Sequence, residues 1–254
     1  MSAYDKVLKS REKGRPTAIR YINEIVENFI ELHGDRRFSD DKAVIGGIGT
    51  VCGMPVTVIG IEKGDTTQDK IAHNFGCAHP EGYRKAVRLM KEAEKFHRPV
   101  LCFVDTSGAF CGLGAEERGQ AEAIATSILE MIRLKTPTLS VIIGEGGSGG
   151  ALSLCAADEV WITSNSTYSV ISPEGCASIL WKDSAKVAEA SESLKLTADD
   201  LISLGAVEAI FEEENFPDSF FSDMKERIAA FFTEKKKEDV SRLVEERYKR
   251  FRKF

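Results

Sequence analysis

The chain has 254 residues, of which 43% are hydrophobic and 29% are charged, as in an ordinary globular protein with a sizeable core. Its net charge of -6 argues against nucleic-acid binding as a main role, because no excess of Lys and Arg is available for phosphates. No apolar run reaches the roughly 18 residues that a membrane span needs, and the N-terminus is polar. We therefore expect no membrane role and a cytoplasmic location.

The first part of the chain predicts one long helix and a hairpin. Residues 1–15 are largely charged and are expected to be flexible. Pro16 can open a helix whose apolar residues keep helical spacing to about residue 33. Two strands, 43–51 and 55–61, are joined by a short Gly-containing turn. Residues 62–80 then predict an irregular polar loop.

Apolar strands alternate with helices through the middle of the chain. The predicted helices cover residues 81–97, 115–134 and 149–157, and the predicted strands cover residues 100–104, 138–143, 160–163 and 168–171. This alternation indicates an α/β domain with helices packed on a largely parallel sheet.

The rest of the chain predicts further helices. Several run from Pro173 to about residue 204, a short strand follows at 207–211, and a C-terminal helical region starts at about residue 213. No linker or repeat divides the chain, so residues 16–254 are expected to form one domain.

The six cysteines are dispersed, with no C-x-x-C pair among them. A zinc site needs closely spaced ligand pairs, and no histidine forms such a pair with a cysteine, so no metal site is expected. The cysteines are expected to be small buried hydrophobic residues in a reducing compartment.

Residues 144–150 read Gly-Glu-Gly-Gly-Ser-Gly-Gly, between an apolar strand and a predicted helix. Glycines let backbone N–H groups approach a ligand closely, because no Cβ is in the way. Three chemistries use such a turn: dinucleotide binding, a nucleophilic serine, and an oxyanion hole made of amides.

The first two chemistries lack their partner residues. The dinucleotide fingerprint fits Gly144, Gly146 and Gly149, but the next strand ends near Thr163 with no Asp or Glu for the ribose. The hydrolase pattern fits Ser148, but no histidine follows it in the chain. An earlier histidine or a lysine remains open as its base.

The third chemistry needs only backbone groups. Residues 106–110 form a second Gly-containing turn after the strand 100–104. If the two strands are neighbours, the amides of both turns converge at the carboxyl edge of the sheet, where helix N-termini stabilise a negative oxygen.

Four segments of the chain are together similar to one known family. They are residues 74–90 (Asn-Phe-Gly-Cys-Ala-His-Pro-Glu-Gly-Tyr onward), 114–120 (Gly-Ala-Glu-Glu-Arg-Gly-Gln), 143–152 and 166–182 (Ser-Thr-Tyr-Ser-Val-Ile-Ser-Pro-Glu-Gly-Cys onward). They resemble the carboxyltransferase alpha subunit of bacterial acetyl-CoA carboxylase, from about residue 16 to residue 212.

This resemblance implies a crotonase-like (ClpP/crotonase) fold and an α2β2 assembly with a beta subunit that carries the zinc. The implied reaction moves a carboxyl group from carboxybiotin, held on a carrier protein that biotin carboxylase loads, to acetyl-CoA. The product is malonyl-CoA, at the first step of fatty-acid synthesis. Biotin acts as its own base, so no catalytic His or Asp is required.

The resemblance also implies roles for individual residues. The backbone amides of the oxyanion hole are assigned to Gly108, Ala109, Gly146, Gly147 and Gly149. The residues assigned to the substrate site are Arg84, Lys85, Arg88, Phe110, Ser148, Ser172 and Glu174. Ser148 is a turn residue and not a nucleophile.

Several of these residues also have simpler explanations. Arg84, Lys85 and Arg88 favour a solvated helix face, and contacts with the CoA phosphates or with the beta subunit are the alternative. Ser172 followed by Pro173 and Glu174 has the form of a helix N-cap. The basic tail 247–254 predicts a docking helix.

Three positions depart from the family pattern. Asp65 replaces an Arg, Gln68 replaces a Lys, and Ser107 replaces a Pro. The loss of two positive charges would weaken a contact with CoA phosphate or with an acidic partner. A diverged subunit that uses another acyl-CoA, or a noncatalytic scaffold, is therefore the alternative hypothesis.

Overall fold

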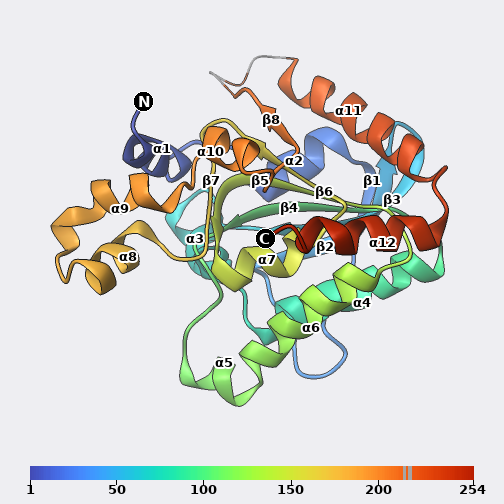
Figure 1. Ribbon diagram of the computed structural model, residues 1–254. Coiled ribbons are helices and arrows are strands. Elements are labelled where there is room, and N and C mark those ends of the chain that lie inside the picture. The colour runs from blue at the N-terminus through green and yellow to red at the C-terminus, as the bar shows by residue number, and fades with distance from the viewer. Residues whose placement is uncertain (214–215, 217–218) are drawn as a thin grey trace.

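An eight-stranded sheet runs through the molecule, with helices against both of its faces (Figure 1). The computed structural model describes residues 1–213, 216 and 219–254. The strands are β1 (Glu27–Glu31), β2 (Val44–Val51), β3 (Met54–Ile61), β4 (Val100–Thr106), β5 (Thr138–Gly147), β6 (Glu159–Thr163), β7 (Thr167–Ser169) and β8 (Ala209–Phe211).

The sheet order is β1-β2-β3-β4-β5-β6-β8, and β7 pairs with β5 outside this path. The pairs β1–β2 and β2–β3 are antiparallel, whereas β3–β4, β4–β5, β5–β6 and β6–β8 are parallel. The largely parallel α/β sheet and the hairpin before it are therefore confirmed.

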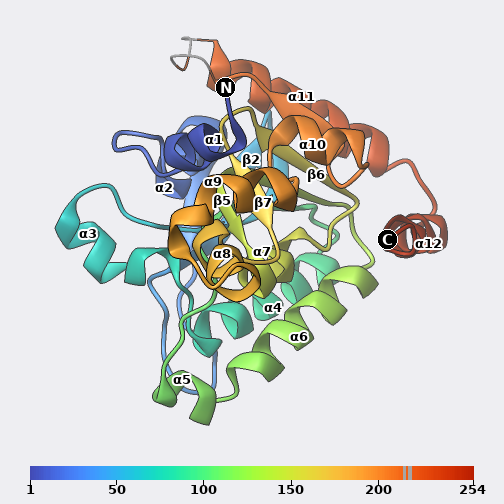
Figure 2. The same ribbon diagram turned by 60° about the vertical axis from the view of Figure 1, so that its left-hand side comes forward.

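The α-helices alternate with these strands and gather again after β7. They are α1 (Ala3–Ser10), α2 (Ala18–Ile25), α3 (Thr67–Ala72), α4 (Pro80–Lys95), α5 (Leu113–Glu117), α6 (Gln120–Arg133), α7 (Ser148–Cys155), α8 (Pro173–Leu180), α9 (Val187–Leu194), α10 (Ala198–Ser203), α11 (Phe220–Lys235) and α12 (Val240–Phe251). Helices α8 and α9 lie together at the left side of the molecule in Figure 1, outside the layers that cover the sheet, and come to the front in Figure 2.

Each face of the sheet carries its own apolar core. On one face α4, α6 and α7 pack against strand side chains such as Ile59 and Val104. On the other face α2 and α11 enclose Phe103 and Val141, with Tyr21 between them. The alternation of side chains along each buried strand produces these two cores, because successive residues point to opposite faces.

The first helix was not expected. Residues 1–15 were predicted to be flexible, yet α1 is a regular helix with a capping box in which Ser2 and Asp5 bond each other's backbone N–H groups. Ala3 and Val7 are buried on its inner side. The charged residues of this segment cover the outer side, so its composition concealed an amphipathic helix.

The predicted helix from Pro16 to about residue 33 is wrong in its second half. Helix α2 ends at Ile25, and β1 follows and pairs with β2. Asn28 adopts a positive φ of 52°, which interrupts helical geometry and bulges the strand. Apolar residues at helical spacing on both sides of this break produced the error.

The predicted helix 115–134 is divided in two by Gly119, whose φ of 82° is left-handed. The loop predicted at 62–80 contains α3 and a short 3-10 helix, Asn74–Gly76. The predicted start of the C-terminal helices, near residue 213, adjoins residues outside the described part of the chain. Of the cysteines, Cys102, Cys155 and Cys176 are buried as expected, whereas Cys52 and Cys111 are exposed.

The C-terminal tail is a docking helix for this chain's own domain. Arg247 is 1% exposed and bonds both carboxylate oxygens of Asp158, at 2.7 and 2.9 Å. Its remaining N–H groups donate to the carbonyls of Met131, Leu134 and Thr136. These partners lie just before β5 and β6, so α12 closes the amino edge of the sheet.

Candidate active site at the carboxyl edge of the sheet

The two Gly-containing turns lie against each other at the carboxyl ends of β4 and β5. Thr106 pairs with Gly146 across the two parallel strands. A Cβ on Gly147 would overlap the carbonyl of Ser107, and a Cβ on Gly150 would lie 2.8 Å from the backbone nitrogen of Ala109. Backbone contact this close is possible only because both positions are glycine.

The glycine run itself is divided between a strand and a helix. Strand β5 continues through Gly147, and α7 begins at Ser148. Gly146 and Gly147 therefore lie in the ladder with β7, whereas Gly149 and Gly150 lie in the first helical turn. The N–H groups of that first turn have no acceptor within the helix and carry the positive end of its dipole.

The turn after β4 has an unusual backbone conformation. Gly108 has a φ of 150°, with open space where a Cβ would stand. Its N–H donates to Thr106 Oγ1 at 3.0 Å, and that hydroxyl donates to the Gly108 carbonyl at 2.8 Å. Thr106 thus fixes the shape of the turn, and Ala109 follows it.

Strand β5 changes partner on the way to the turn. It pairs with β6 over Leu139–Ile142 and with β7 over Glu145–Gly147. Opposite this change, β4 advances from Val104 to Thr106 while β5 advances from Ile142 to Gly146. The extra residues form a bulge, and a bulge bends a strand and redirects the residues that follow.

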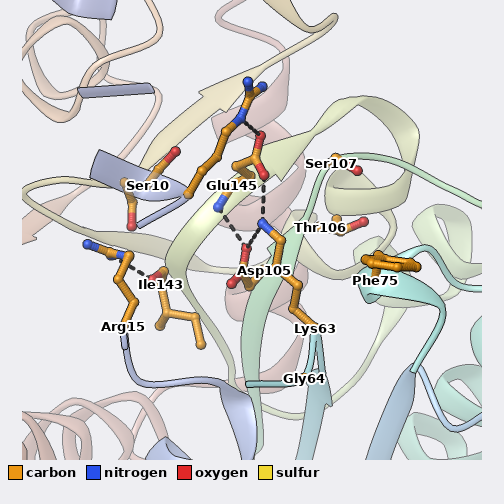
Figure 3. Close-up of polar contacts among 12 residues, drawn as sticks. Ser10, Arg15, Lys63, Gly64, Phe75, Asp105, Thr106, Ser107, Ile143 and Glu145 are labelled. Atoms are coloured by element: carbon orange, nitrogen blue, oxygen red, sulfur yellow. Dashed lines mark hydrogen bonds and ion pairs between the residues drawn. The ribbon is translucent and has the colours of Figure 1, made fainter. Parts of the chain in front are cut away.

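Buried charges surround this bulge (Figure 3). Lys63 Nζ lies 2.6 Å from Glu145 Oε2 and 3.3 Å from Asp105 Oδ1. Arg11, which follows α1, donates from Nε to Glu145 Oε1 at 2.7 Å and from Nη1 to Glu174 at 2.6 Å. We call Arg11, Lys63, Asp105 and Glu145 the charge cluster.

Mutual attraction favours the charged forms of Glu145 and Lys63. Burial alone would raise the pKa of Glu145, but the charges of Lys63 and Arg11 outweigh it and lower that pKa. Burial likewise opposes the charge on Lys63, yet Asp105 and Glu145 outweigh it and raise the pKa of that amine. Glu145 and Lys63 are therefore held as a charged pair next to the two turns.

The predicted phosphate contacts on α4 are engaged elsewhere. Lys85 is fully buried, with its ammonium 2.5 Å from Asp40 Oδ1 and 2.8 Å from the carbonyl of Asp41. Arg84 bonds Asp35 and the carbonyl of Arg118, while Arg88 Nε bonds the carbonyl of Gly34 at 3.1 Å.

These contacts match neither a solvated helix face nor cations that are free to bind a CoA phosphate. The three cations hold the loop before β2 against α4, so they do not form a solvated face. A CoA phosphate would have to displace these partners, Lys85's above all.

The remaining predicted residues lie around the turns. Phe110 stacks on His79, with ring centroids 4.1 Å apart. Ser148 is exposed at a φ of 53°. Ser172 caps α8 by accepting the N–H of Gly175 at 3.1 Å, as its N-cap pattern predicted, and Glu174 bonds Arg11.

A groove of about 520 Å³ begins at the N-terminus of α7. Its lining is mainly apolar and includes Gly149, Leu152, Tyr168, Val170 and Phe254. The amide end of α7 thus opens onto a surface that could hold an apolar ring system.

Sequence reasoning did not identify the charge cluster. Lys63 lies in the segment 62–80 that was predicted to be an irregular loop, and Glu145 had no predicted role. One signal was available: an acid between glycines at the end of a buried strand needs a partner, because an unpaired buried charge is costly.

The positions that depart from the family pattern lie at the surface. Asp65 and Gln68 are exposed, before and within α3. Ser107 is also exposed, with its hydroxyl 3.5 Å from Cys77 Sγ. None of the three replacements disturbs the packing of the site.

Comparison with known proteins decides the family. The family model described as acetyl co-enzyme A carboxylase carboxyltransferase-like matches residues 1–254. The chain is 64% identical over 213 residues to the acetyl-coenzyme A carboxylase carboxyl transferase subunit alpha of Ruminiclostridium cellulolyticum, covering 84% of this chain and 82% of the relative. It is 52% identical over 256 residues to the same subunit of Streptococcus sanguinis, covering all of both. The chain belongs to this carboxyltransferase alpha-subunit family.

Solved structures of carboxylases share the fold. Transcarboxylase 12S superposes with a TM-score of 0.76 at 17% identity, over 93% of this chain and 44% of its own. The beta subunit of P. aeruginosa geranyl-CoA carboxylase gives a TM-score of 0.69 at 15% identity, over 96% of this chain and 46% of its own. The expected crotonase-like fold is therefore confirmed. Within the described residues, every helix is too short or too polar to cross a bilayer.

Proposed function

We propose that this chain is the alpha subunit of a carboxyltransferase that moves a carboxyl group from carboxybiotin on a carrier protein to acetyl-CoA. The product would be malonyl-CoA, the building unit of fatty-acid synthesis. The observation that carries the proposal is the contact of the two turns, because it packs the backbone after β4 against the start of α7 at the carboxyl edge. The names of the relatives support the reaction.

The residues present fit the ureido group of biotin. Convergent N–H donors from the two turns would stabilise negative charge on its oxygen without an ionisable side chain. Space is open beside Gly108, where a Cβ would stand, and the apolar groove begins at Gly149. A polar oxygen at the amides and an apolar ring in the groove would both be accommodated.

Among the predicted donors we favour Ala109 and Gly149. The amide of Gly108 is bonded to Thr106, and Gly146 and Gly147 lie in the strand ladder. Gly149 lies in the first turn of α7, where the helix dipole adds to the hydrogen bond. One such donor contributes about 10²–10³-fold in rate.

These residues bind and orient, and they need not transfer a proton. When bound, carboxybiotin supplies the carboxyl group and the base that takes a proton from the acetyl methyl group. Ser148 and Phe110 border the donors, while Ser172 and Glu174 fix the start of α8 beside them. The cations on α4 would then support the site through the loop that they hold.

The proposal includes partners. A beta subunit that carries zinc would complete the site in an α2β2 assembly and provide the amides for the thioester oxygen. The biotin carboxyl carrier protein would deliver the carboxyl group after biotin carboxylase loads it. The exposed Asp65 and Gln68 would weaken any acidic contact at α3, so another acyl-CoA is the alternative substrate.

The deciding experiment uses the assembled enzyme. The purified chain and its beta subunit are mixed with biotin carboxylase, biotinylated carrier, ATP, bicarbonate and acetyl-CoA, and malonyl-CoA is measured. Formation that depends on both subunits supports the proposal. Failure with acetyl-CoA but turnover of propionyl-CoA would favour the alternative substrate, and failure with every acyl-CoA would favour a noncatalytic scaffold.

Replacement of Gly149 tests the amide role. A Cβ there would lie 3.3 Å from Ile124 Cγ2, so Gly149→Ala fits with a small adjustment, whereas Gly149→Val places branched atoms at the mouth of the groove. We expect Val to lower kcat by about 10²-fold or more and Ala to lower it less. Circular dichroism and co-purification with the beta subunit serve as controls. Unchanged turnover in Gly149→Val would remove the amide from the mechanism.

A further inference from the structure

The charge cluster takes one residue from each of three neighbouring strand ends. Lys63 follows β3 by two residues, Asp105 precedes the last residue of β4, and Glu145 is the last residue of the bulged segment of β5. Figure 3 shows the ammonium of Lys63 between the two carboxylates. It bonds both of them, so a single cation joins the three strands at the edge that carries the turns.

Asp105 also holds the bulge directly. Its Oδ1 accepts the N–H of Glu145 at 2.9 Å. A Cβ on Gly144 would lie 2.5 Å from its carboxyl carbon, so the carboxylate fills the space that the glycine leaves open. The side chain of β4 therefore takes the place of a regular strand hydrogen bond and fixes the extra residues of β5.

The segments that lead into the two turns begin one residue beyond these carboxylates. Thr106, which shapes the first turn, follows Asp105, and Gly146, which leads to the second, follows Glu145. A shift of either carboxylate thus moves a turn. A misplacement of about 1 Å can cost roughly 10²-fold in rate. Catalysis therefore requires the two turns to be placed more accurately than folding does.

We propose that Lys63 is a positioning residue that sets the relative placement of the two amide turns by holding Asp105 and Glu145 together. The side chains of these carboxylates are only 9% and 10% exposed. Without Lys63 they would be two poorly hydrated like charges, with Arg11 bonded to only one of them, and they would separate or draw in water. The proposal depends on the function proposed above only for its activity measurement.

The experiment compares Lys63→Met and Lys63→Arg in the complex with the beta subunit. We expect Lys63→Met to lower kcat by about 10²-fold while the KM for acetyl-CoA stays within about threefold, because the lost interaction acts in the transition state. Lys63→Arg keeps the charge and should regain part of kcat. Hydrogen exchange should become faster in segments 104–112 and 143–152 of the Met variant, with α12 unchanged.

The matched control is Arg247→Lys, in the buried ion pair that Arg247 of α12 forms with Asp158 just before β6. It should lower the melting temperature while kcat and exchange at the turns remain as in the wild type. Glu145→Gln, which keeps the shape and removes one charge, replaces Lys63→Met if that variant does not fold, with the same expected exchange pattern.

Two results would overturn the proposal. One is a Lys63→Met enzyme that loses stability but keeps kcat, and the other is unchanged exchange at both turns. If the wild-type complex makes no malonyl-CoA, the proposed function fails, whereas the exchange comparison still decides the role of Lys63.

Discussion

At its amino end β5 is closed by side chains, whereas at its carboxyl end it is shaped by glycines and by buried charges. The N–H of Thr138 donates to Asp158 at 2.7 Å, and Arg247 bonds the same carboxylate. At the other end Gly147 and Gly150 keep the backbone bare against the turn of β4. Side chains that satisfy every polar group stabilise a strand, and a backbone left accessible can bind a ligand.

Gly147→Ala should have the largest effect, because its Cβ would force the two turns apart. We expect turnover to fall by about 10³-fold, with a loss of unfolding free energy of about 1–3 kcal/mol from overpacking. Malonyl-CoA formation and chemical denaturation measure the two effects.

Gly53→Ala in the β2–β3 hairpin is the control for this substitution. Its φ of 76° is strained for alanine, yet no atom lies within 4 Å of the new Cβ. It should cost stability and leave turnover unchanged. Equal losses of turnover in both variants would show that turnover does not depend specifically on the contact between the turns at the carboxyl end of β5.

Acid should loosen the carboxyl end through Glu145. Its pKa is lower in the folded chain than its ordinary value of 4.5, so its ionised form contributes stability above that pH. The contribution is lost as the pH falls below 4.5 toward the folded pKa. Glu145→Gln should therefore flatten the pH dependence of the unfolding free energy between pH 5 and pH 3. An unchanged slope would contradict the ionised cluster.

Ser148→Ala should have the smallest effect. The hydroxyl is exposed, and the backbone of the turn is held by its neighbours. We expect kcat to stay within about threefold of the wild type, because only the amides take part. A complete loss of turnover in a folded enzyme would support a nucleophilic serine instead.

The parallel sheet could be predicted from the sequence because its strands are buried on both faces and read as unbroken apolar runs. The strand 100–104 is of this kind, whereas the antiparallel hairpin 43–61 was marked by its short Gly-containing turn. Their ends could also be placed, which is why the meeting of the two Gly-containing turns was foreseen. The glycines of these turns marked the positions where the backbone of one turn closely approaches that of the other.

Strand β1 could not be predicted, because the spacing of its apolar residues also fits a helix. The spacing of Val26, Phe29 and Ile30 suits a helix, but Asn28 turns the chain and β2 offers a ladder to β1. Pairing with a distant strand overrode the local preference. The charge cluster was out of reach for the same reason, since Lys63 lies 42 positions from Asp105 and 82 from Glu145.

The first residues of the chain contact residues that are distant in the sequence, and this affects the order in which the parts of the molecule fold. Arg11 contacts Glu145 and Glu174, at separations of 134 and 163 residues, and Arg15 contacts Glu213 at 198. Closing such long loops is slow compared with forming hairpins and neighbouring βαβ units. We therefore expect the carboxyl edge to become ordered late, after most of the chain has left the ribosome.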